Sequence, residues 1–121
     1  MTEFVAAVPV VPSRDIDAST SWYRDRLGFE VFVSESDYGI VGRGEAWIHF
    51  CGPSQAPIED SIRIAVHGID ELYAHCVERQ IADPDVQVAE QPWGFREFSI
   101  VDGDGRSITF FEPPTDYDPR A

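Results

Sequence analysis

The sequence has 121 residues, of which 43% are hydrophobic, and its 22 acidic and nine basic residues give a formal net charge of −13. This length suits one domain with its own hydrophobic core. The charge excludes nucleic acid as a partner because it repels phosphate groups, and it favours a cationic ligand, although acidity alone also keeps a small protein soluble.

The first half of the chain predicts a strand, a helix and three further strands. Residues 5–11 form a short apolar run, in which Pro9 and Pro12 are typical of an edge strand or an exchanged arm. A helix is expected to begin at Asp15 and to end at Gly28. Its apolar side carries Ile16, Tyr23 and Leu27. Strands are then expected at residues 29–33, 38–41 and 46–51, with residues 42–44 as the turn between the last two.

The second half repeats this order. A strand is expected at residues 61–66, and Gly68 precedes a second helix. The apolar stripe of that helix has helical spacing and consists of Ile69, Leu72, Tyr73, Cys76 and Val77. Strands should follow at residues 86–89, 96–101 and 106–111, with Asp-Gly-Asp-Gly at residues 102–105 as the turn between the last two.

The two halves are related by a shift of 53 residues, because Ile16-Asp17 and Ile69-Asp70 mark equivalent helix starts. We therefore predict an α+β fold of two βαβββ modules, in which a helix covers each curved mixed sheet. The expected organisation is a single domain with module 1 at about residues 1–52, module 2 at about residues 58–112 and a flexible tail at residues 113–121.

The sequence also predicts where the protein resides. No apolar stretch is long enough to span a membrane, and the first residues lack the basic start of a secretion signal. Cys51 and Cys76 have neither metal-binding nor redox spacing, which is typical of reduced thiols in a core or a groove. We expect a cytoplasmic protein without a membrane partner.

Trp93 stands out among the aromatic residues. Phe29 and Phe32 are expected in the core, but Trp93 lies between Pro92 and Gly94, where a loop leads into a strand. An aromatic residue on such a loop either packs locally or offers a flat surface to a planar ligand.

Several motifs resemble those of one superfamily. The first helix carries DIDAS at residues 15–19 and WYRDRLGF at residues 22–29, which resemble the vicinal oxygen chelate superfamily of glyoxalases, extradiol dioxygenases and bleomycin resistance proteins. The segments AVPV, GIDELY, EQPWG and REF at residues 7–10, 68–73, 90–94 and 96–98 are similar to the bleomycin resistance branch. That resemblance implies a homodimer that binds a glycopeptide antibiotic without chemistry and needs no cofactor.

The resemblance also allows a test for metal ligands. Metal-dependent members place His or Glu at four equivalent strand positions, which align with Val8, His49, Ser61 and Thr109. Only His49 is a good ligand, whereas a catalytic divalent ion needs about three protein ligands. We therefore expect no bound metal, provided that the strand register is correct.

Strand alternation predicts which side chains line the binding cavity. If His49 faces the cavity, then Trp47 and Cys51 share its face. In the second module, the predicted cavity side chains are Ser61, Arg63, Ala65, Ser107, Thr109 and Phe111. Arg63 does not suit a cationic guest and is expected to bond a carboxylate, a carbonyl or Glu97.

Tyr38 and Trp93 are the predicted stacking residues. By resemblance, the ligand lies between an aromatic residue of one subunit and a Trp of the other, and these two residues match those positions. The alternative role for Trp93 is to fill the dimer interface. Pro9 and Pro12 are compatible with exchange of the N-terminal arm between subunits.

The predicted ligand-binding residues are Tyr38, Trp47, His49, Ser61, Arg63, Trp93, Thr109 and Phe111. Together they favour a protein that sequesters a cationic bleomycin-family glycopeptide in an aromatic groove at the dimer interface. Two alternatives remain open, namely a divalent-metal-dependent lyase or dioxygenase that uses His49 as one ligand, and a binder of another aromatic small molecule.

Overall fold

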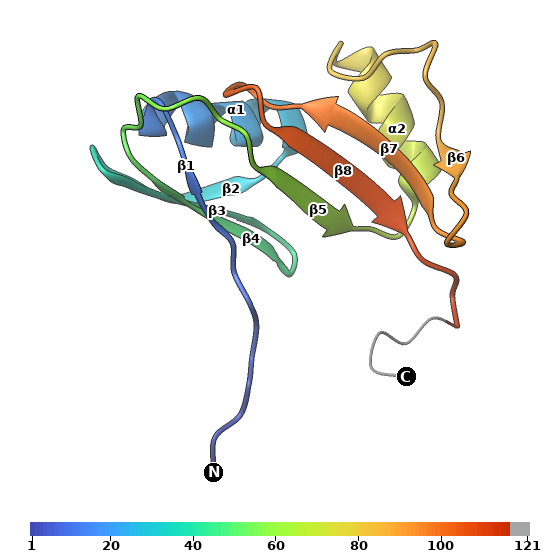
Figure 1. Ribbon diagram of the computed structural model, residues 1–121, viewed down its shortest axis with the longest axis horizontal. Coiled ribbons are helices and arrows are strands. Elements are labelled where there is room, and N and C mark those ends of the chain that lie inside the picture. The colour runs from blue at the N-terminus through green and yellow to red at the C-terminus, as the bar shows by residue number, and fades with distance from the viewer. Residues whose placement is uncertain (117–121) are drawn as a thin grey trace. The chain divides into compact units, whose positions relative to one another are not determined.

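The computed structural model describes residues 1–116 and contains two compact units, which divide between Glu59 and Asp60. Each unit consists of one four-stranded sheet and one helix (Figure 1). Within both units the chain order is strand, helix and three strands. This confirms the predicted α+β class with two βαβββ modules.

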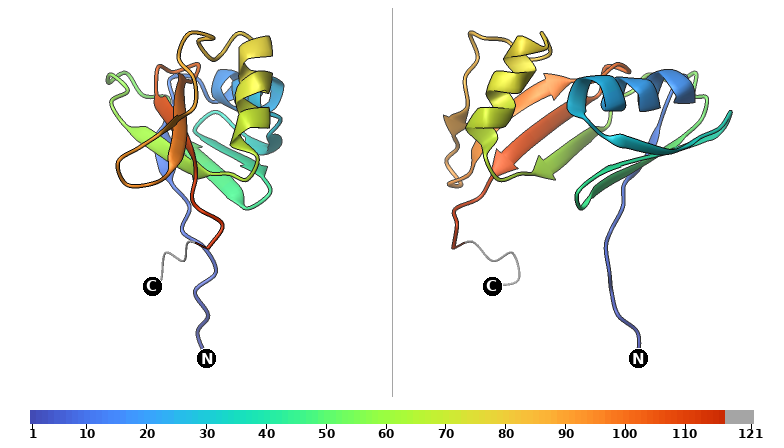
Figure 2. Two further views of the ribbon diagram at one scale, coloured as in Figure 1. Left: turned by 90° about the vertical axis from the view of Figure 1, so that its right-hand side faces the viewer. Right: turned by 180° about the vertical axis from the view of Figure 1, so that it is seen from behind.

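The first unit has a mixed sheet with one helix against it. Its elements are β1 (Val10–Pro12), α1 (Ile16–Leu27), β2 (Glu30–Ser34), β3 (Tyr38–Arg43) and β4 (Ala46–Cys51). The strand order is β1-β4-β3-β2, with β1 parallel to β4 and the other pairs antiparallel. Figure 2 shows α1 along one face of this sheet. The opposite face carries no element of the same unit, and we call it the open face.

Helix α1 has local start and stop signals. The Asp15 side chain accepts a hydrogen bond from the Ala18 backbone N–H at 3.1 Å and caps the helix. Gly28 ends it in the left-handed conformation, with φ of 70°, which glycine adopts without steric cost. The expected apolar side, formed by Ile16, Tyr23 and Leu27, is buried.

The core of the first unit lies between α1 and the sheet. Val41, Ile48 and Phe50 point from β3 and β4 toward the helix and are buried. Gly39 permits a close approach, because a Cβ there would lie 2.9 Å from both the Ile16 and Thr20 Cγ2 atoms. The helix therefore packs directly on the backbone of β3.

The second unit has the same topology. Its elements are β5 (Ser61–Ala65), α2 (Ile69–Glu78), β6 (Ala89–Glu90), β7 (Arg96–Val101) and β8 (Ser107–Glu112). The strand order is β5-β8-β7-β6, with β5 parallel to β8 and the other pairs antiparallel. The core face is apolar and consists of Ile62, Ile64, Phe98, Ile100, Ile108 and Phe110.

Helix α2 begins without a capping side chain of its own, because Gly68 occupies the N-cap position. The Glu112 carboxylate at the end of β8 accepts hydrogen bonds from the backbone N–H groups of Gly68 and Ile69, at 2.5 and 3.3 Å. Arg96 of β7 donates two hydrogen bonds to the Asp70 carboxylate, both at 2.8 Å. Two strands thus fix the start of α2, and a negative charge there interacts favourably with the helix dipole.

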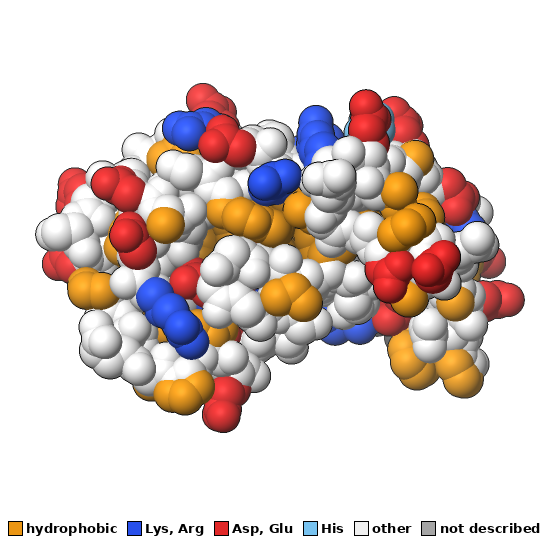
Figure 3. All heavy atoms as spheres, turned by 90° about the horizontal axis from the view of Figure 1, so that it is seen from above, with side chains coloured by type: hydrophobic (Ala, Val, Ile, Leu, Met, Phe, Trp, Pro, Cys, Tyr) orange, Lys and Arg blue, Asp and Glu red, His pale blue; other side chains and the backbone are white. Residues whose placement is uncertain are grey.

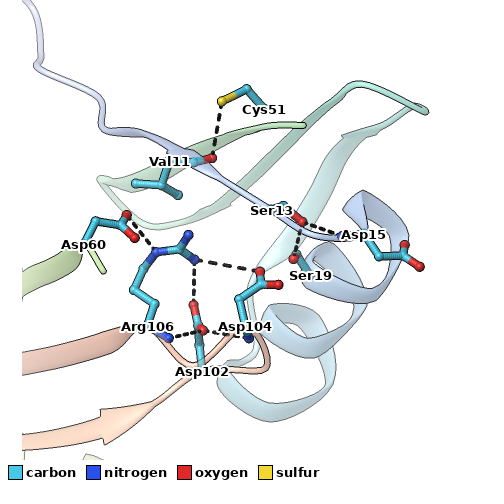
Figure 4. Close-up of polar contacts among 9 residues, drawn as sticks. All are labelled: Val11, Ser13, Asp15, Ser19, Cys51, Asp60, Asp102, Asp104 and Arg106. Atoms are coloured by element: carbon cyan, nitrogen blue, oxygen red, sulfur yellow. Dashed lines mark hydrogen bonds and ion pairs between the residues drawn. The ribbon is translucent and has the colours of Figure 1, made fainter. Parts of the chain in front are cut away.

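A buried arginine stabilises the turn between β7 and β8 (Figure 4). Arg106 is 0% exposed and donates hydrogen bonds to Asp102 at 2.8 Å and to Asp60 at 2.9 Å. The other Asp102 oxygen accepts from the backbone N–H groups of Asp104 and Arg106. The predicted turn at residues 102–105 is confirmed, and the side chains of its aspartates neutralise the buried guanidinium.

Two predicted strands are shorter than expected. The N-terminal strand begins at Val10 rather than at residue 5, since pairing with β4 starts with the bond from the His49 N–H to the Pro9 carbonyl, at 3.0 Å. Residues 1–8 pair with no strand among the described residues, and residues 1–9 are exposed. The strand predicted at residues 86–89 shrinks to Ala89–Glu90, because the Val86 N–H bonds the Asp83 carbonyl in a turn.

Of the predicted tail at residues 113–121, residues 117–121 lie outside the part of the chain that is described. No helix within residues 1–116 is long and apolar enough to cross a membrane. Cys76 is buried on α2, and Cys51 is exposed at the end of β4.

Candidate functional site

The open faces of the two sheets carry seven of the eight predicted site residues. Strand alternation and register place Tyr38, Trp47 and His49 on the open face of the first sheet. Ser61, Arg63, Thr109 and Phe111 share the open face of the second sheet. Alternating neighbours such as Ile48, Phe50, Ile108 and Phe110 are buried on the helix side, so the predicted alternation is confirmed. The eighth residue, Trp93, lies in the loop between β6 and β7.

A tight turn presents the Trp93 ring. The Gly94 N–H bonds the Gln91 carbonyl at 2.8 Å, and the Gln91 N–H bonds the Phe95 carbonyl at 2.8 Å. Pro92 suits the second position of this four-residue turn because its φ angle is already fixed. Trp93 follows it and is 59% exposed. We call residues 91–94 the Trp93 turn.

One carboxylate lies at the centre of the second open face. Glu97, on β7, is only 8% exposed and accepts a hydrogen bond from the Trp93 indole N–H at 2.8 Å. Arg63, on β5, donates to both Glu97 oxygens, at 2.7 and 3.3 Å. The Arg63 guanidinium holds the pKa of Glu97 below its ordinary value, and the Trp93 N–H acts in the same direction. Glu97 is therefore a carboxylate at neutral pH, and Arg63 balances its charge.

The same arginine contacts an aromatic pair. The Arg63 guanidinium carbon lies 4.7 Å from the centroid of the Phe111 ring, within the range of a cation–π interaction. Phe111 also stacks on Phe95, with centroids 5.4 Å apart and an interplanar angle of 15°. Phe95 comes directly after the Trp93 turn, so an aromatic contact also holds the end of this loop.

The remaining predicted residues of the second face are small and polar. The hydroxyls of Thr109 and Ser99 lie 2.7 Å apart and share a hydrogen bond. Ser61 lies opposite Ser107 at the start of β5, outside the Arg63–Glu97 cluster. Sequence reasoning named Glu97 only as a partner for Arg63 and did not consider Phe95. Extending strand alternation to residues 96–101 would have placed Glu97 on the open face.

In the first unit, Tyr38 and His49 form a pair. The Tyr38 hydroxyl makes a short hydrogen bond with His49 Nδ1, and the two rings meet edge to face. Both side chains are half-buried. His49 lies opposite Ile40 on β3 and Val10 on β1, so its neighbours in the sheet are apolar.

Phe32 is not in the core, and that prediction was wrong, whereas Phe29 is buried as expected. Alternation from Phe29 places Phe32 on the open side of β2, where it is 48% exposed and stacks on Trp47 with centroids 4.5 Å apart. The Trp47 ring lies against Gly42 of β3, where the absence of a Cβ leaves room for it. A Cβ at Gly42 would come within 2.8 Å of the ring. The first open face thus carries a stacked aromatic pair that the sequence reasoning missed.

No metal-binding cluster forms among the described side chains. Within residues 1–116, no group of three or more His, Cys, Asp or Glu side chains could hold a metal ion. The strand neighbour of His49 is Val10, and that of Thr109 is Arg63, which is paired with Glu97. The acidic side chains are spread over the face drawn in Figure 3 rather than gathered in one patch.

Comparison with known proteins reveals similarity over nearly the whole chain, although no family model matches it. The bleomycin resistance protein of Geobacillus stearothermophilus is 30% identical, in an alignment that covers 88% of this chain and 95% of that protein. A crystal structure of a bleomycin-binding protein complexed with bleomycin has a TM-score of 0.79 at 25% identity and covers 92% of this chain and 100% of its own.

A second solved structure is that of the bleomycin-binding protein from bleomycin-producing Streptomyces verticillus, complexed with copper(II)-bleomycin. Its TM-score is 0.72 at 31% identity, and the match covers 91% of this chain and 97% of that chain. Both the sequence and the structural similarities therefore extend across the two units.

Proposed function

Since the chain belongs to the bleomycin resistance protein family of the vicinal oxygen chelate superfamily, we propose that it binds and sequesters bleomycin-type glycopeptides without chemical turnover. Two structurally similar proteins are complexed with bleomycin or copper(II)-bleomycin, and the expected resistance follows from lowering the free drug concentration. The proposal places the protein in the cytoplasm, where it would intercept the antibiotic before the drug reaches its target.

The exposed Trp93 ring is the observation that carries this proposal. Trp93 is held on a tight turn and bonded to a buried carboxylate, yet more than half of its surface faces solvent. A large indole surface that is fixed but uncovered is suited to stacking on a flat heteroaromatic group. Such stacking contributes about 0.5–1.5 kcal/mol beyond the burial of apolar area.

The second half of the proposed groove comes from the first open face of a partner subunit. There Tyr38 is the proposed counterpart of Trp93, with Trp47 and His49 beside it on the same sheet. An open face with exposed rings such as Phe32 and Trp47 would gain stability by being covered, which supports a homodimer. The net charge of −13 would attract a cationic glycopeptide to either groove of the dimer.

We also propose that the N-terminal arm, residues 1–9, is exchanged between subunits. The arm contains Phe4, Val5 and Val8, whose side chains are exposed in the single chain. It ends where β1 begins, and its backbone groups would gain partners by pairing with a second copy. Deletion of residues 1–8 should then weaken the dimer, which sedimentation at several protein concentrations would measure.

Calorimetric titration of the purified protein with metal-free bleomycin tests the function directly. We expect binding near one ligand per chain, and at least about tenfold weaker binding for Trp93→Ala, which corresponds to about 1.4 kcal/mol. Val86→Ala is the matched control because Val86 is an apolar residue of the same unit that is equally exposed, at 60%. Absence of heat with every bleomycin-class compound would refute the proposal.

Two further measurements on the same sample separate the alternatives. Stoichiometric zinc, nickel, iron or manganese in carefully purified protein would favour a metal-dependent lyase or dioxygenase that uses His49. A thermal-shift panel of aromatic metabolites would detect a different ligand, because binding to the native state alone raises the unfolding temperature.

A further inference from the structure

The Trp93 ring has one polar anchor, although most of its surface is free. The Trp93 turn fixes the backbone, but the two side-chain torsions of the residue would still let the ring swing over solvent. The hydrogen bond from the indole N–H to the Glu97 carboxylate, at 2.8 Å, selects one orientation. A charged acceptor makes this bond stronger than a bond between neutral groups.

Glu97 cannot turn freely itself. It lies within β7 between Ala89 of β6 and Phe111 of β8, so strands on both sides restrict its backbone. Arg63 donates to both carboxylate oxygens, and the oxygen that is 2.7 Å from Arg63 is the one that accepts the indole N–H. A bidentate contact of this kind fixes the carboxylate plane.

The Arg63 guanidinium in turn contacts the face of the Phe111 ring, and Phe111 stacks on Phe95, which directly follows the Trp93 turn. The contacts therefore form a closed chain from Trp93 through Glu97, Arg63, Phe111 and Phe95 back to the loop. A change at Glu97, which is only 8% exposed, would loosen the ring and leave the stacking surface of Trp93 chemically unchanged.

We propose that Glu97 and Arg63 are positioning residues that hold the Trp93 ring in the orientation in which it stacks on its ligand. This inference rests on the proposed function of Trp93. It assigns a role to the Arg63–Glu97 ion pair. Because the two charges cancel, this pair would otherwise contribute little to binding a cation. It also explains why an arginine lies on a face expected to receive a cationic guest: its charge is used by Glu97.

The first test follows the indole N–H by nitrogen-15 NMR. The chain has three tryptophans, Trp22, Trp47 and Trp93, and Trp93→Phe identifies the signal of interest. Exchange of the Trp93 indole proton with solvent should become at least about tenfold faster in Glu97→Leu and measurably faster in Arg63→Met, because the bonded state no longer protects it. Unchanged signals of Trp22 and Trp47 would show that the first unit is folded, and unchanged amide signals of α2 would show the same for the second unit.

The second test measures bleomycin affinity in the same variants. We expect Glu97→Leu to weaken binding about five- to thirtyfold, and Arg63→Met to weaken it less, since Glu97 can still accept the indole bond. In a Trp93→Phe background, which lacks the N–H, Glu97→Leu should have almost no further effect. This non-additivity distinguishes positioning through Trp93 from a general loss of stability.

The matched control is a second bidentate pair of the same unit. Arg96 and Asp70 make the same type of contact at 2.8 Å but connect β7 to α2. Arg96→Met should change neither the Trp93 exchange rate nor the affinity. An equal loss in Arg96→Met and Arg63→Met would overturn the proposal.

The outcomes separate the inference from the function on which it rests. If wild-type protein binds bleomycin and Glu97→Leu binds equally well, the positioning role is wrong and the proposed function stands. If wild-type protein does not bind bleomycin, the proposed function fails. The exchange rates would then still decide whether Glu97 and Arg63 hold the ring.

Discussion

The two units share one topology, but different interactions hold their helices and turns in place. In the first unit, Gly39 lets α1 pack on the backbone of β3, and Asp15 caps the helix from the adjacent position. In the second unit, Glu112 caps α2 from 44 residues away, and Arg106 joins Asp60 to the last turn. The repeat therefore preserves strand alternation, whereas the contacts that close each module differ.

The open faces differ in the same way. The first carries the uncharged Phe32–Trp47 stack and the Tyr38–His49 bond, whereas an ion pair orders the second. Substitutions of charged residues should therefore affect the second unit most, and substitutions that disturb close packing should affect the first.

The largest effect is expected for Arg106→Leu. Removal of the guanidinium leaves the buried Asp102 carboxylate without its counter-charge, which costs about 3–5 kcal/mol for a broken buried pair. Arg43→Leu is the first-unit control. It should cost about 1 kcal/mol, since the Arg43 partner is an uncharged backbone carbonyl, that of Leu27, at 2.7 Å. Urea unfolding measures both, and equal losses would contradict the contrast between the units.

A smaller effect is expected for the glycines of β3. Gly39→Ala forces the new methyl group against Ile16 and Thr20, and overpacking of this kind costs about 1–3 kcal/mol. Gly42→Ala should cost less, because the half-exposed Trp47 ring can move aside. Its signature is loss of the Phe32–Trp47 stack in the near-ultraviolet circular dichroism. A greater loss of stability for Gly42→Ala would show that the stack matters more than the helix contact.

The helix caps should contribute about 1 kcal/mol each, despite their different origins. Asp15→Ala removes a local cap, and Glu112→Ala removes a distant one. Amide hydrogen exchange should increase at the start of α1 in the first variant and at the start of α2 in the second. If either variant shows faster exchange at both helix starts, then the stability of one helix start depends on the cap of the other module.

The smallest effect is expected for the exposed Arg96–Asp70 pair. The Arg96 hydrogen bonds hold the pKa of Asp70 below its ordinary value of about 3.9. The pair therefore stabilises the fold fully at pH values above that ordinary pKa. The contribution is lost as the pH falls through the lowered pKa of the folded state. Asp70→Asn should therefore barely change the urea midpoint at pH 7, because solvent screens the pair. A destabilisation that grows as the pH falls from 7 would contradict this sign.

Much of the fold could be predicted because its signals are local. The strands Ala46–Cys51 and Arg96–Val101 have the predicted bounds, since alternation and flanking turn residues define them. The helix starts at Ile16 and Ile69 were also predicted, from a capping aspartate and a glycine. The strand expected at residues 5–11 begins only at Val10, because an extended segment becomes a strand only beside a partner, which sequence periodicity does not supply.

The site was harder to predict because it depends on contacts between strands. Phe32 was assigned to the core on its apolar character, although alternation from Phe29 already placed it on the other face. The importance of Glu97 comes from its simultaneous contacts with Arg63 and Trp93, which lie 34 and four positions away in the sequence. Residue type alone therefore cannot show that this carboxylate holds an exposed ring.

The bond between Tyr38 and His49 has a consequence for proton placement. When the Tyr38 hydroxyl donates to Nδ1, the neutral imidazole carries its proton on Nε2. His49 then offers a hydrogen-bond donor, and it can no longer give the Nε2 lone pair that a metal ion requires. In that arrangement, His49 presents a donor suited to a carbonyl or ring nitrogen, whereas the reverse direction, with Nδ1–H donating to the phenolic oxygen, leaves Nε2 as an acceptor.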